Sequence, residues 1–228
     1  YGQSNPQKTN EKGHFNLFVP AGKYYLKVDA KNHRSLISNI FEVKETMPIL
    51  STLHMKEAKR LTVGGMTVHI PPFSNDTVDV TPPKLPNTKI LKSREMIGKQ
   101  VSDFTLQDLN NKNVRSIDFN GKPTVITFIS SWSPSAREQL IVLSKLQANK
   151  DINVVPIVAQ EGSGKIKPII DIGGLQLEVL IDPDGVTVDS FKVQSLPSTY
   201  IIDRRGMVKK VMVCVLSEDK IINALGEQ

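Results

Sequence analysis

The chain has a single cysteine, Cys214, and no apolar run that approaches the roughly 18 residues of a membrane-spanning helix. One thiol excludes an intrachain disulfide and any metal site built from several cysteines. Arginine clusters with interleaved aromatic residues, which are typical of nucleic-acid surfaces, are also missing. We therefore expect no cofactor, no bound metal and no nucleic-acid partner.

Positive charge is confined to one part of the chain. The formal net charge is +6, with 14 Lys and Arg against 8 Asp and Glu in residues 1–97, and 15 against 15 in residues 98–228. The excess lysines are scattered through strand-like sequence, which favours a solvated surface over a binding site. At 228 residues, the chain is long enough for two domains that each bury a core.

The N-terminal region alternates apolar and polar residues. Phe15, Leu17 and Val19 precede a Pro-Ala-Gly turn, and Leu26 and Val28 follow it, which predicts a β-hairpin. Further strand-like segments lie at residues 40–43, 49–55 and 61–70. This spacing predicts an all-β sandwich.

The order of residues in this hairpin resembles the carboxypeptidase-regulatory-like domains, which are prealbumin-type sandwiches of extracytoplasmic bacterial proteins. The matching residues are Thr9, Gly13, Phe15, Pro20, Gly22, Tyr24 or Tyr25, Leu26, Val28 and Ala30. The two opening strands of that family are absent, so the predicted Ig/prealbumin-like sandwich is incomplete. An incomplete sandwich exposes an edge, where we expect a donated strand or a second copy of the chain to bind.

Five prolines lie at residues 71–97, among Asn, Asp, Thr and Lys: Pro71, Pro72, Pro82, Pro83 and Pro86. Repeated breakers without an amphipathic period predict a semi-extended linker. We therefore expect three regions, with a β-sandwich at 1–70, a proline-rich linker at 71–97 and a further domain at 98–228.

The C-terminal region alternates strand-like and helix-like sequence. Strands are expected at 104–106, 124–130, 154–158, 179–181, 199–202 and 208–213, with helices from Pro134, near 166–172 and from Glu218. Alternation of this kind, with two late strands in succession, predicts an α/β fold with a mixed central sheet and helices on both faces.

Four motifs in residues 98–228 resemble the thioredoxin-like superfamily, and within it the redoxin branch of thiol-disulfide oxidoreductases and peroxiredoxins. They are Val101-Ser-Asp-Phe-Thr-Leu, Asn120-Gly-Lys-Pro-Thr-Val-Ile-Thr-Phe, Leu180-Ile-Asp-Pro-Asp-Gly and Leu196-Pro-Ser-Thr-Tyr-Ile-Ile-Asp. In that family a Trp-Cys-x-x-Cys turn begins a helix, whose N-terminus lowers the pKa of the first thiol. This chain has Trp132 at the turn but Ser133 and Ala136 at the two cysteine positions.

The resemblance also implies a cis bond before Pro197, beside the turn, and a backbone edge that binds an extended peptide. The alternative is that Pro197 only ends a loop before a strand. The candidate binding residues are Trp132, Ser133, Pro134, Leu196 and Pro197, with no intact catalytic residue and vestigial positions at Ser133 and Ala136.

Serine cannot replace cysteine in disulfide exchange, because the thiolate forms the mixed disulfide. A hydrolytic Ser133 needs a neighbouring base, and the four histidines, His14, His33, His54 and His69, all precede residue 70. Helix capping suffices for this segment: Ser133 as N-cap before Pro134, and Ser135 with Glu138 as a capping box. Cys214 is expected to be buried and inert at the end of the last strand.

We therefore predict a redox-inactive thioredoxin-like protein of the cell envelope or extracellular space that binds a protein or serves as a structural subunit. The missing cysteines argue against enzymatic activity but leave the question open. The alternative is a thiol-disulfide oxidoreductase whose catalytic cysteines are replaced by Ser133 and Ala136. A third possibility is a subunit of an extracellular assembly. The chain begins at Tyr1, and we expect its targeting segment to lie outside it.

Overall fold

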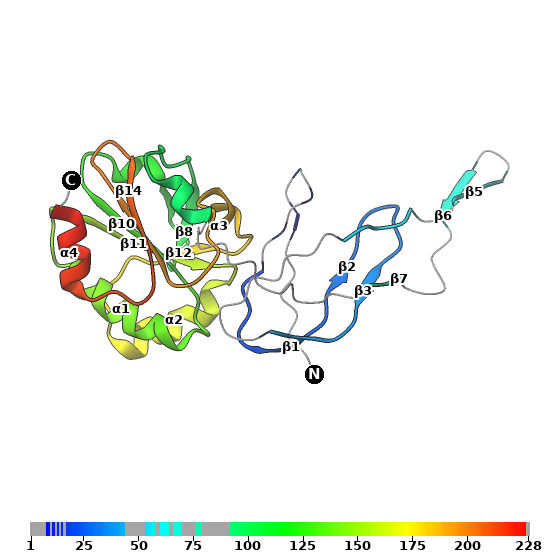
Figure 1. The fold of residues 1–228 in the computed structure, drawn as a ribbon, viewed down its shortest axis with the longest axis horizontal. Coiled ribbons are helices and arrows are strands. Elements are labelled where there is room, and N and C mark those ends of the chain that lie inside the picture. Colours follow the sequence, from blue (N-terminus) through cyan, green and yellow to red (C-terminus); the bar gives the residue numbers. More distant parts are fainter. Residues whose placement is uncertain are drawn as a thin grey trace. The chain divides into compact units, whose positions relative to one another are not determined.

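The computed structural model describes residues 8–9, 11, 13, 15, 17–43, 53–57, 60–63, 66–69, 76–78 and 92–226. The chain divides into two compact units (Figure 1). One unit is Val19–Thr88, and the other combines Tyr1–Phe18 with Lys89–Gln228. The domain boundaries expected from the sequence stay a prediction, and each unit is taken by itself below.

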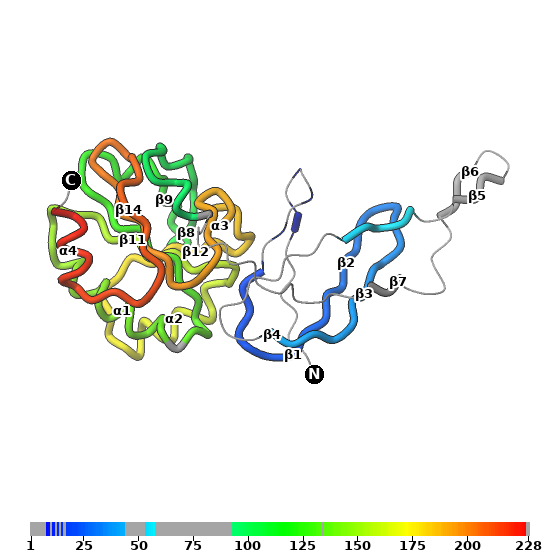
Figure 2. The backbone as a smooth tube through the Cα atoms, in the orientation of Figure 1, coloured from blue at the N-terminus to red at the C-terminus, as the bar shows by residue number. Residues whose placement is uncertain are grey.

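The unit Val19–Thr88 contains short strands in three small sheets, and its backbone over residues 19–43 can be followed in Figure 2. The strands are β1 (Gly22–Tyr24), β2 (Lys27–Val28), β3 (Leu36–Ser38), β4 (Phe41–Val43), β5 (Arg60–Val63), β6 (Met66–His69) and β7 (Asp76–Val78). β1 pairs antiparallel with β4, β2-β3-β7 form a three-stranded sheet, and β5 and β6 form a hairpin. A complete sandwich is not shown by these sheets and stays a prediction.

The expected hairpin across residues 15–28 is wrong. β1 pairs with β4 and β2 pairs with β3, while residues 17–19 form no strand. The buried side chains of Leu36 and Phe41 explain the difference, because burying them favours pairing with the later strands. β7 lies inside the segment predicted as linker and pairs parallel with β3. Residues 44–52 and 79–91 lie outside the described residues.

The C-terminal unit is a thioredoxin-like α/β fold with a mixed sheet. Its strands are β8 (Thr105–Asp108), β9 (Asn113–Arg115), β10 (Thr124–Ile129), β11 (Asn153–Ala159), β12 (Leu180–Asp182), β13 (Ser198–Ile202) and β14 (Val208–Val213). Its helices are η1 (Lys92–Met96), η2 (Ser116–Phe119), α1 (Pro134–Leu146), α2 (Ser163–Gly173), α3 (Val186–Ser190) and α4 (Glu218–Gly226). The strand order is β14-β13-β10-β11-β12-β8-β9. β10, β11 and β12 are parallel, whereas β13 and β8 run against their neighbours.

Alternation along the strands divides the core between the two faces of this sheet. One face of the sheet carries a buried cluster that contains Ile126, Phe128, Tyr200 and Phe191, the residue that follows α3. Val125 and Ile129 face the other side, which α1, α2 and α4 cover (Figure 1). All six residues of β10 are buried, as expected for a central strand with both faces covered. The alternating strands and helices expected from residue 98 onward are confirmed, while β9 and α3 were missed because each is too short to show a period.

We predict that Tyr200→Phe lowers the free energy of unfolding of this unit by about 1 kcal/mol. The Tyr200 hydroxyl donates a 2.8 Å hydrogen bond to the carbonyl oxygen of Phe191, and both side chains are fully buried. Burial also raises the pKa of Tyr200 above its ordinary value. Urea titration followed by the fluorescence of Trp132, the one tryptophan of the chain, measures the change. The matched control is Tyr25→Phe, at an exposed residue of the other unit, and an equal effect of both changes would contradict the prediction.

Candidate functional site

One edge of the C-terminal sheet collects the residues that the sequence singled out. β10, β11 and β12 are parallel, so their carboxyl ends meet there, and the antiparallel strand β13 begins at the same edge. In the sheet, β10 has β11, the next strand of the chain, on one side and β13, a much later strand, on the other. In α/β sheets, ligands bind outside the carboxyl ends of the parallel strands. We call this region the site edge. It consists of the turn Ser130 to Ser133 and the residues around Pro197.

A tight turn at the site edge connects β10 to α1. The Ser133 amide donates to the Ser130 carbonyl oxygen at 3.2 Å, and the extended backbone of Ser133 makes it the N-cap of α1. Pro134 occupies the first turn of the helix, where its missing N–H costs nothing. The predicted N-cap and N1 positions are therefore confirmed.

The Ser133 hydroxyl does not cap the helix. It lies 2.7 Å from the hydroxyl oxygen of Ser135, and no side-chain hydrogen bond caps α1 at this residue. The predicted capping box of Ser135 and Glu138 is wrong, because α1 begins at Pro134 and Ser135 is already helical. The first turn of α1 therefore receives no side-chain cap from Ser133, and its Ala136 amide donates to the Ser133 carbonyl oxygen instead.

The two positions that carry cysteine in the resembling family differ in exposure. Ser133 and Trp132 are half-buried, whereas Ala136 is buried against Ile129 and Leu140. The Ala136 amide donates to the Ser133 carbonyl oxygen at 2.9 Å, so the two positions share one helical turn. A hydroxyl and a methyl group at these positions supply no thiolate, and they cannot form a disulfide.

A buried carboxylate holds the turn. Glu161 follows β11 and is 6% exposed. One of its oxygens accepts the Ser131 amide at 2.9 Å, and the other accepts the Ser131 hydroxyl. Because the carboxylate receives both donors of one residue, it fixes the turn to the end of the neighbouring strand. Sequence reasoning missed this residue, because a carboxylate two positions past a buried strand does not by itself identify its partner, Ser131, 30 residues away.

The peptide bond between Leu196 and Pro197 is cis, which confirms the expectation from the sequence. Ser198 pairs with Phe128, so Pro197 lies beside the end of β10 and close to the turn. Pro197 is buried and Leu196 is half-buried against the core. The structure thus brings the five predicted binding residues, Trp132, Ser133, Pro134, Leu196 and Pro197, to one edge of the sheet.

Cys214 is exposed, so the expectation of a buried thiol is wrong. β14 ends at Val213, which pairs with Ser198, and Cys214 lies one residue past the last pair of the sheet. The sheet therefore does not cover its side chain.

Gln139, on the inner side of α1, is a second residue that sequence reasoning missed. It is fully buried, and its side-chain oxygen accepts the Leu216 amide at 2.7 Å. This bond attaches the segment that follows β14 to the first turns of α1.

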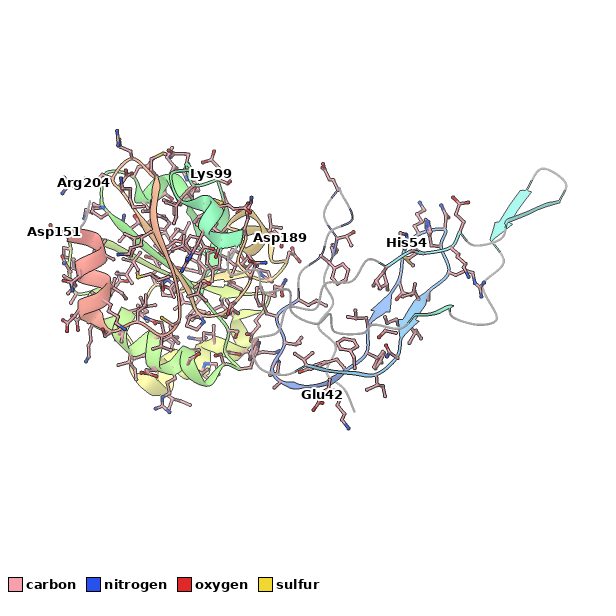
Figure 3. The ribbon with its side chains drawn as sticks, in the orientation of Figure 1. Glu42, His54, Lys99, Asp151, Asp189 and Arg204 are labelled. Carbon is pink, nitrogen blue, oxygen red and sulfur yellow. The ribbon has the colours of Figure 1, made fainter. Side chains whose placement is uncertain are left out.

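The opposite edge of the sheet has a different character. An open pocket of about 430 Å³ there is lined by Pro123, Asp203, Arg204, Arg205, Leu225 and Gly226. Figure 3 shows Arg204 and Asp151 on this side of the unit and Asp189 on the other.

Asp182 ends β12, and burial raises the pKa of its carboxyl group, although the Val188 amide donates to its carboxylate at 2.8 Å. Across the described ranges, no three His, Cys, Asp or Glu side chains gather into a group that could hold a metal ion.

The sequence profile of the AhpC/TSA family matches residues 97–211, which is half of the chain. The chain belongs to the AhpC/TSA family. The match begins just before β8 and ends within β14, so this AhpC/TSA domain contains the site edge.

Relatives of the AhpC/TSA domain carry redox names. The chain is 25% identical over 129 residues to the thioredoxin-like protein YneN of Bacillus subtilis, covering 54% of this chain and 75% of that protein. It is 23% identical over 133 residues to the thiol-disulfide oxidoreductase ResA of Geobacillus thermodenitrificans, covering 57% and 76%. Among solved structures, a putative thiol:disulfide interchange protein DsbE of Chlorobium tepidum matches with a TM-score of 0.52 and 26% identity, covering 57% of this chain and 98% of that one.

We predict that Glu161→Ala destabilises the AhpC/TSA domain by about 1.5–3 kcal/mol, because two donors of Ser131 lose a charged acceptor. Glu161→Gln, which keeps one carbonyl oxygen, is expected to cost less. Urea titrations monitored by Trp132 fluorescence measure both variants. Glu138→Ala, at an exposed residue of α1, is the control, and a loss as small as that of the control would contradict the assigned role of Glu161.

Proposed function

We propose that this protein binds an extended segment of a partner protein at the site edge and does not carry out a dithiol-disulfide cycle of its own. The observation that carries the proposal is the placement of Ser133 and Ala136 in one helical turn. The resemblance to thiol-disulfide oxidoreductases matches these two residues to the family's cysteine positions. The turn and Pro197 are in place at the carboxyl edge of β10, while the sulfur atoms are missing.

Two physical features support binding at this edge. The turn after β10 lies at the carboxyl ends of the parallel strands β10, β11 and β12, which is the edge at which α/β sheets bind ligands. The Ser133 side chain does not cap α1, Pro134 has no N–H, and the Ala136 amide donates to the Ser133 carbonyl oxygen, which leaves the Ser135 amide to receive an acceptor group of a ligand. A peptide segment provides such acceptors as backbone carbonyl oxygens.

The second candidate function is thiol-disulfide exchange, and the names of ResA and the DsbE-like protein favour it. In this alternative, Ser133 and Ala136 replace the cysteines of an oxidoreductase. The two candidates make opposite predictions for the activity of the chain with its own Ser133 and Ala136.

The proposal keeps three further expectations from the sequence. The protein acts in the cell envelope or extracellular space, and the N-terminal region is a carboxypeptidase-regulatory-like domain whose edge receives a strand or a second copy of the chain. No helix within the described ranges combines the length and the apolar character needed to cross a bilayer. Protease accessibility on intact cells tests the location, and sedimentation tests self-association.

Restoring the thiols tests the function. In a Cys214→Ser background, we expect the chain with Ser133 and Ala136 to leave insulin disulfide reduction by dithiothreitol unchanged. The double variant Ser133→Cys, Ala136→Cys is expected to accelerate it by about tenfold or more, because a thiolate at a helix N-terminus attacks within a docked complex.

The single variant Ala136→Cys is the matched control, since it adds one buried thiol without a pair. Activity only in the double variant supports a binding protein whose edge retains the family geometry. Turnover by the chain that keeps its own Ser133 and Ala136 would overturn the proposal. Inactivity of the folded double variant would count against the edge as a peptide site.

A further inference from the structure

The first residues of the chain belong to the same compact unit as the AhpC/TSA domain. This unit combines Tyr1–Phe18 with Lys89–Gln228. The half-buried side chain of Phe18 packs against the buried cluster that contains Phe128, although Phe18 belongs to no helix or strand. A segment from the start of the chain is therefore bound to the domain that carries the site edge.

One side chain holds the backbone of Phe18. Because Phe18 lies outside any strand, its amide needs another acceptor, and it donates a 2.8 Å hydrogen bond to Oε1 of Gln160. Gln160 directly follows β11 and is 4% exposed, and its own amide donates to the Asp182 carbonyl oxygen at 2.8 Å. A buried carboxamide oxygen that accepts a backbone N–H recognises the main chain of a ligand and not the identity of its residue.

The local backbone makes room for this carboxamide. Gln160 has a left-handed φ of 57°, a conformation that persists in a residue other than glycine only where the surrounding contacts hold it. Its side chain lies against Gly185, where an added Cβ would come within 2.8 Å of Nε2 and 3.0 Å of Cγ. Glycine at this position therefore leaves the space that Gln160 fills. We call Gln160, together with the cluster surface that Phe18 covers, the Phe18 receptor.

The Phe18 receptor adjoins the turn of the site edge. Glu161, the residue after Gln160, accepts both donors of Ser131. Ile129 pairs with Val158 in parallel register, and continuation of this register places Gln160 level with Ser131. Neighbouring strands are about 4.8 Å apart and an extended chain advances about 3.3 Å per residue, so two or three residues of a ligand span this distance.

The other part of the site edge shares an apolar surface with Phe18. Leu196 precedes the cis bond to Pro197, and its half-buried side chain packs against the same cluster as Phe18. One extended ligand can therefore contact the turn, the cluster surface and Gln160 together.

We propose that Phe18 occupies the position that a large apolar residue of the partner segment takes, and that the partner binds by displacing it. The inference rests on the proposed function, because the Phe18 receptor extends the same docking edge. It adds the chemistry of the ligand: an aromatic or large aliphatic side chain for the cluster surface, on a residue other than proline, whose N–H donates to Gln160. The chain's own segment lowers the apparent affinity for the partner, since only the fraction of molecules without Phe18 in place can bind.

Peptide binding tests the receptor directly. The probe is a fluorescein-labelled peptide with the sequence of residues 15–21, Phe-Asn-Leu-Phe-Val-Pro-Ala, and its anisotropy is measured with the full chain. We expect Phe18→Ala to bind the peptide about tenfold more tightly than the unchanged chain, because the internal competitor is weakened. The matched control is Phe15→Ala, at an exposed phenylalanine of the same segment, which is expected to bind like the unchanged chain.

A second peptide tests the hydrogen bond to Gln160. Methylation of the backbone nitrogen of its second phenylalanine removes the donor and is expected to weaken binding to Phe18→Ala about fivefold. In the Gln160→Met, Phe18→Ala variant, which lacks the acceptor, both peptides are expected to bind alike. A loss on methylation that persists in this variant would overturn the role of Gln160.

The variants are compared as proteins whose Trp132 fluorescence shows the native fold. Equal affinity of Phe18→Ala, Phe15→Ala and the unchanged chain for the unmethylated peptide would overturn the proposal. Absence of peptide binding to Phe18→Ala would overturn it as well.

Insulin reduction separates this proposal from the docking edge. In the Ser133→Cys, Ala136→Cys variant with Cys214→Ser, the further change Phe18→Ala is expected to lower the KM for insulin about tenfold and to leave kcat unchanged. Activity with an unchanged KM keeps the docking edge and refutes displacement of Phe18. Tighter peptide binding by Phe18→Ala without any insulin reduction keeps the Phe18 receptor and refutes the docking edge at the turn.

Discussion

The antiparallel register between β10 and β13 determines what lies at the site edge. Phe128 pairs with Ser198, so the turn into α1 and the cis bond before Pro197 must lie side by side. The next pairing, Ser198 with Val213, adds the end of β14 to the same edge. A slip of one residue between β10 and β13 would turn Tyr200 out of the core and separate these groups, so packing of the aromatic cluster maintains the geometry of the site.

Much of the C-terminal fold could be predicted because its strands are buried on both faces and its helices have clear apolar stripes. The run at 124–130 and the start of α1 at Pro134 follow from local sequence alone. Glu161 and Gln139 could not be found in this way, since their partners Ser131 and Leu216 are 30 and 77 residues away. The exposure of Cys214 was missed because it depends on where the pairing with β13 stops, which the alternation of β14 does not show.

The N-terminal unit illustrates the opposite case. Its described strands have two to four residues, and β1 pairs with β4 and β3 with β7 instead of with the next strand in sequence. Alternation identifies a strand but contains no information on which strand it will pair with. The expected hairpin was local, whereas the observed pairs depend on contacts between segments farther apart in the chain.

β14 stands at the end of the seven-stranded sheet, and an edge strand of this kind can pair with a strand of another molecule. At its beginning, residues 98 and 99 exchange hydrogen bonds with Val208, which covers part of the edge. The next residues are Lys209 and Lys210, and charged side chains oppose the approach of a second edge. The sequence Val-Lys-Lys-Val-Met-Val thus combines a strand that completes the core with lysines that help keep the protein from aggregating through it.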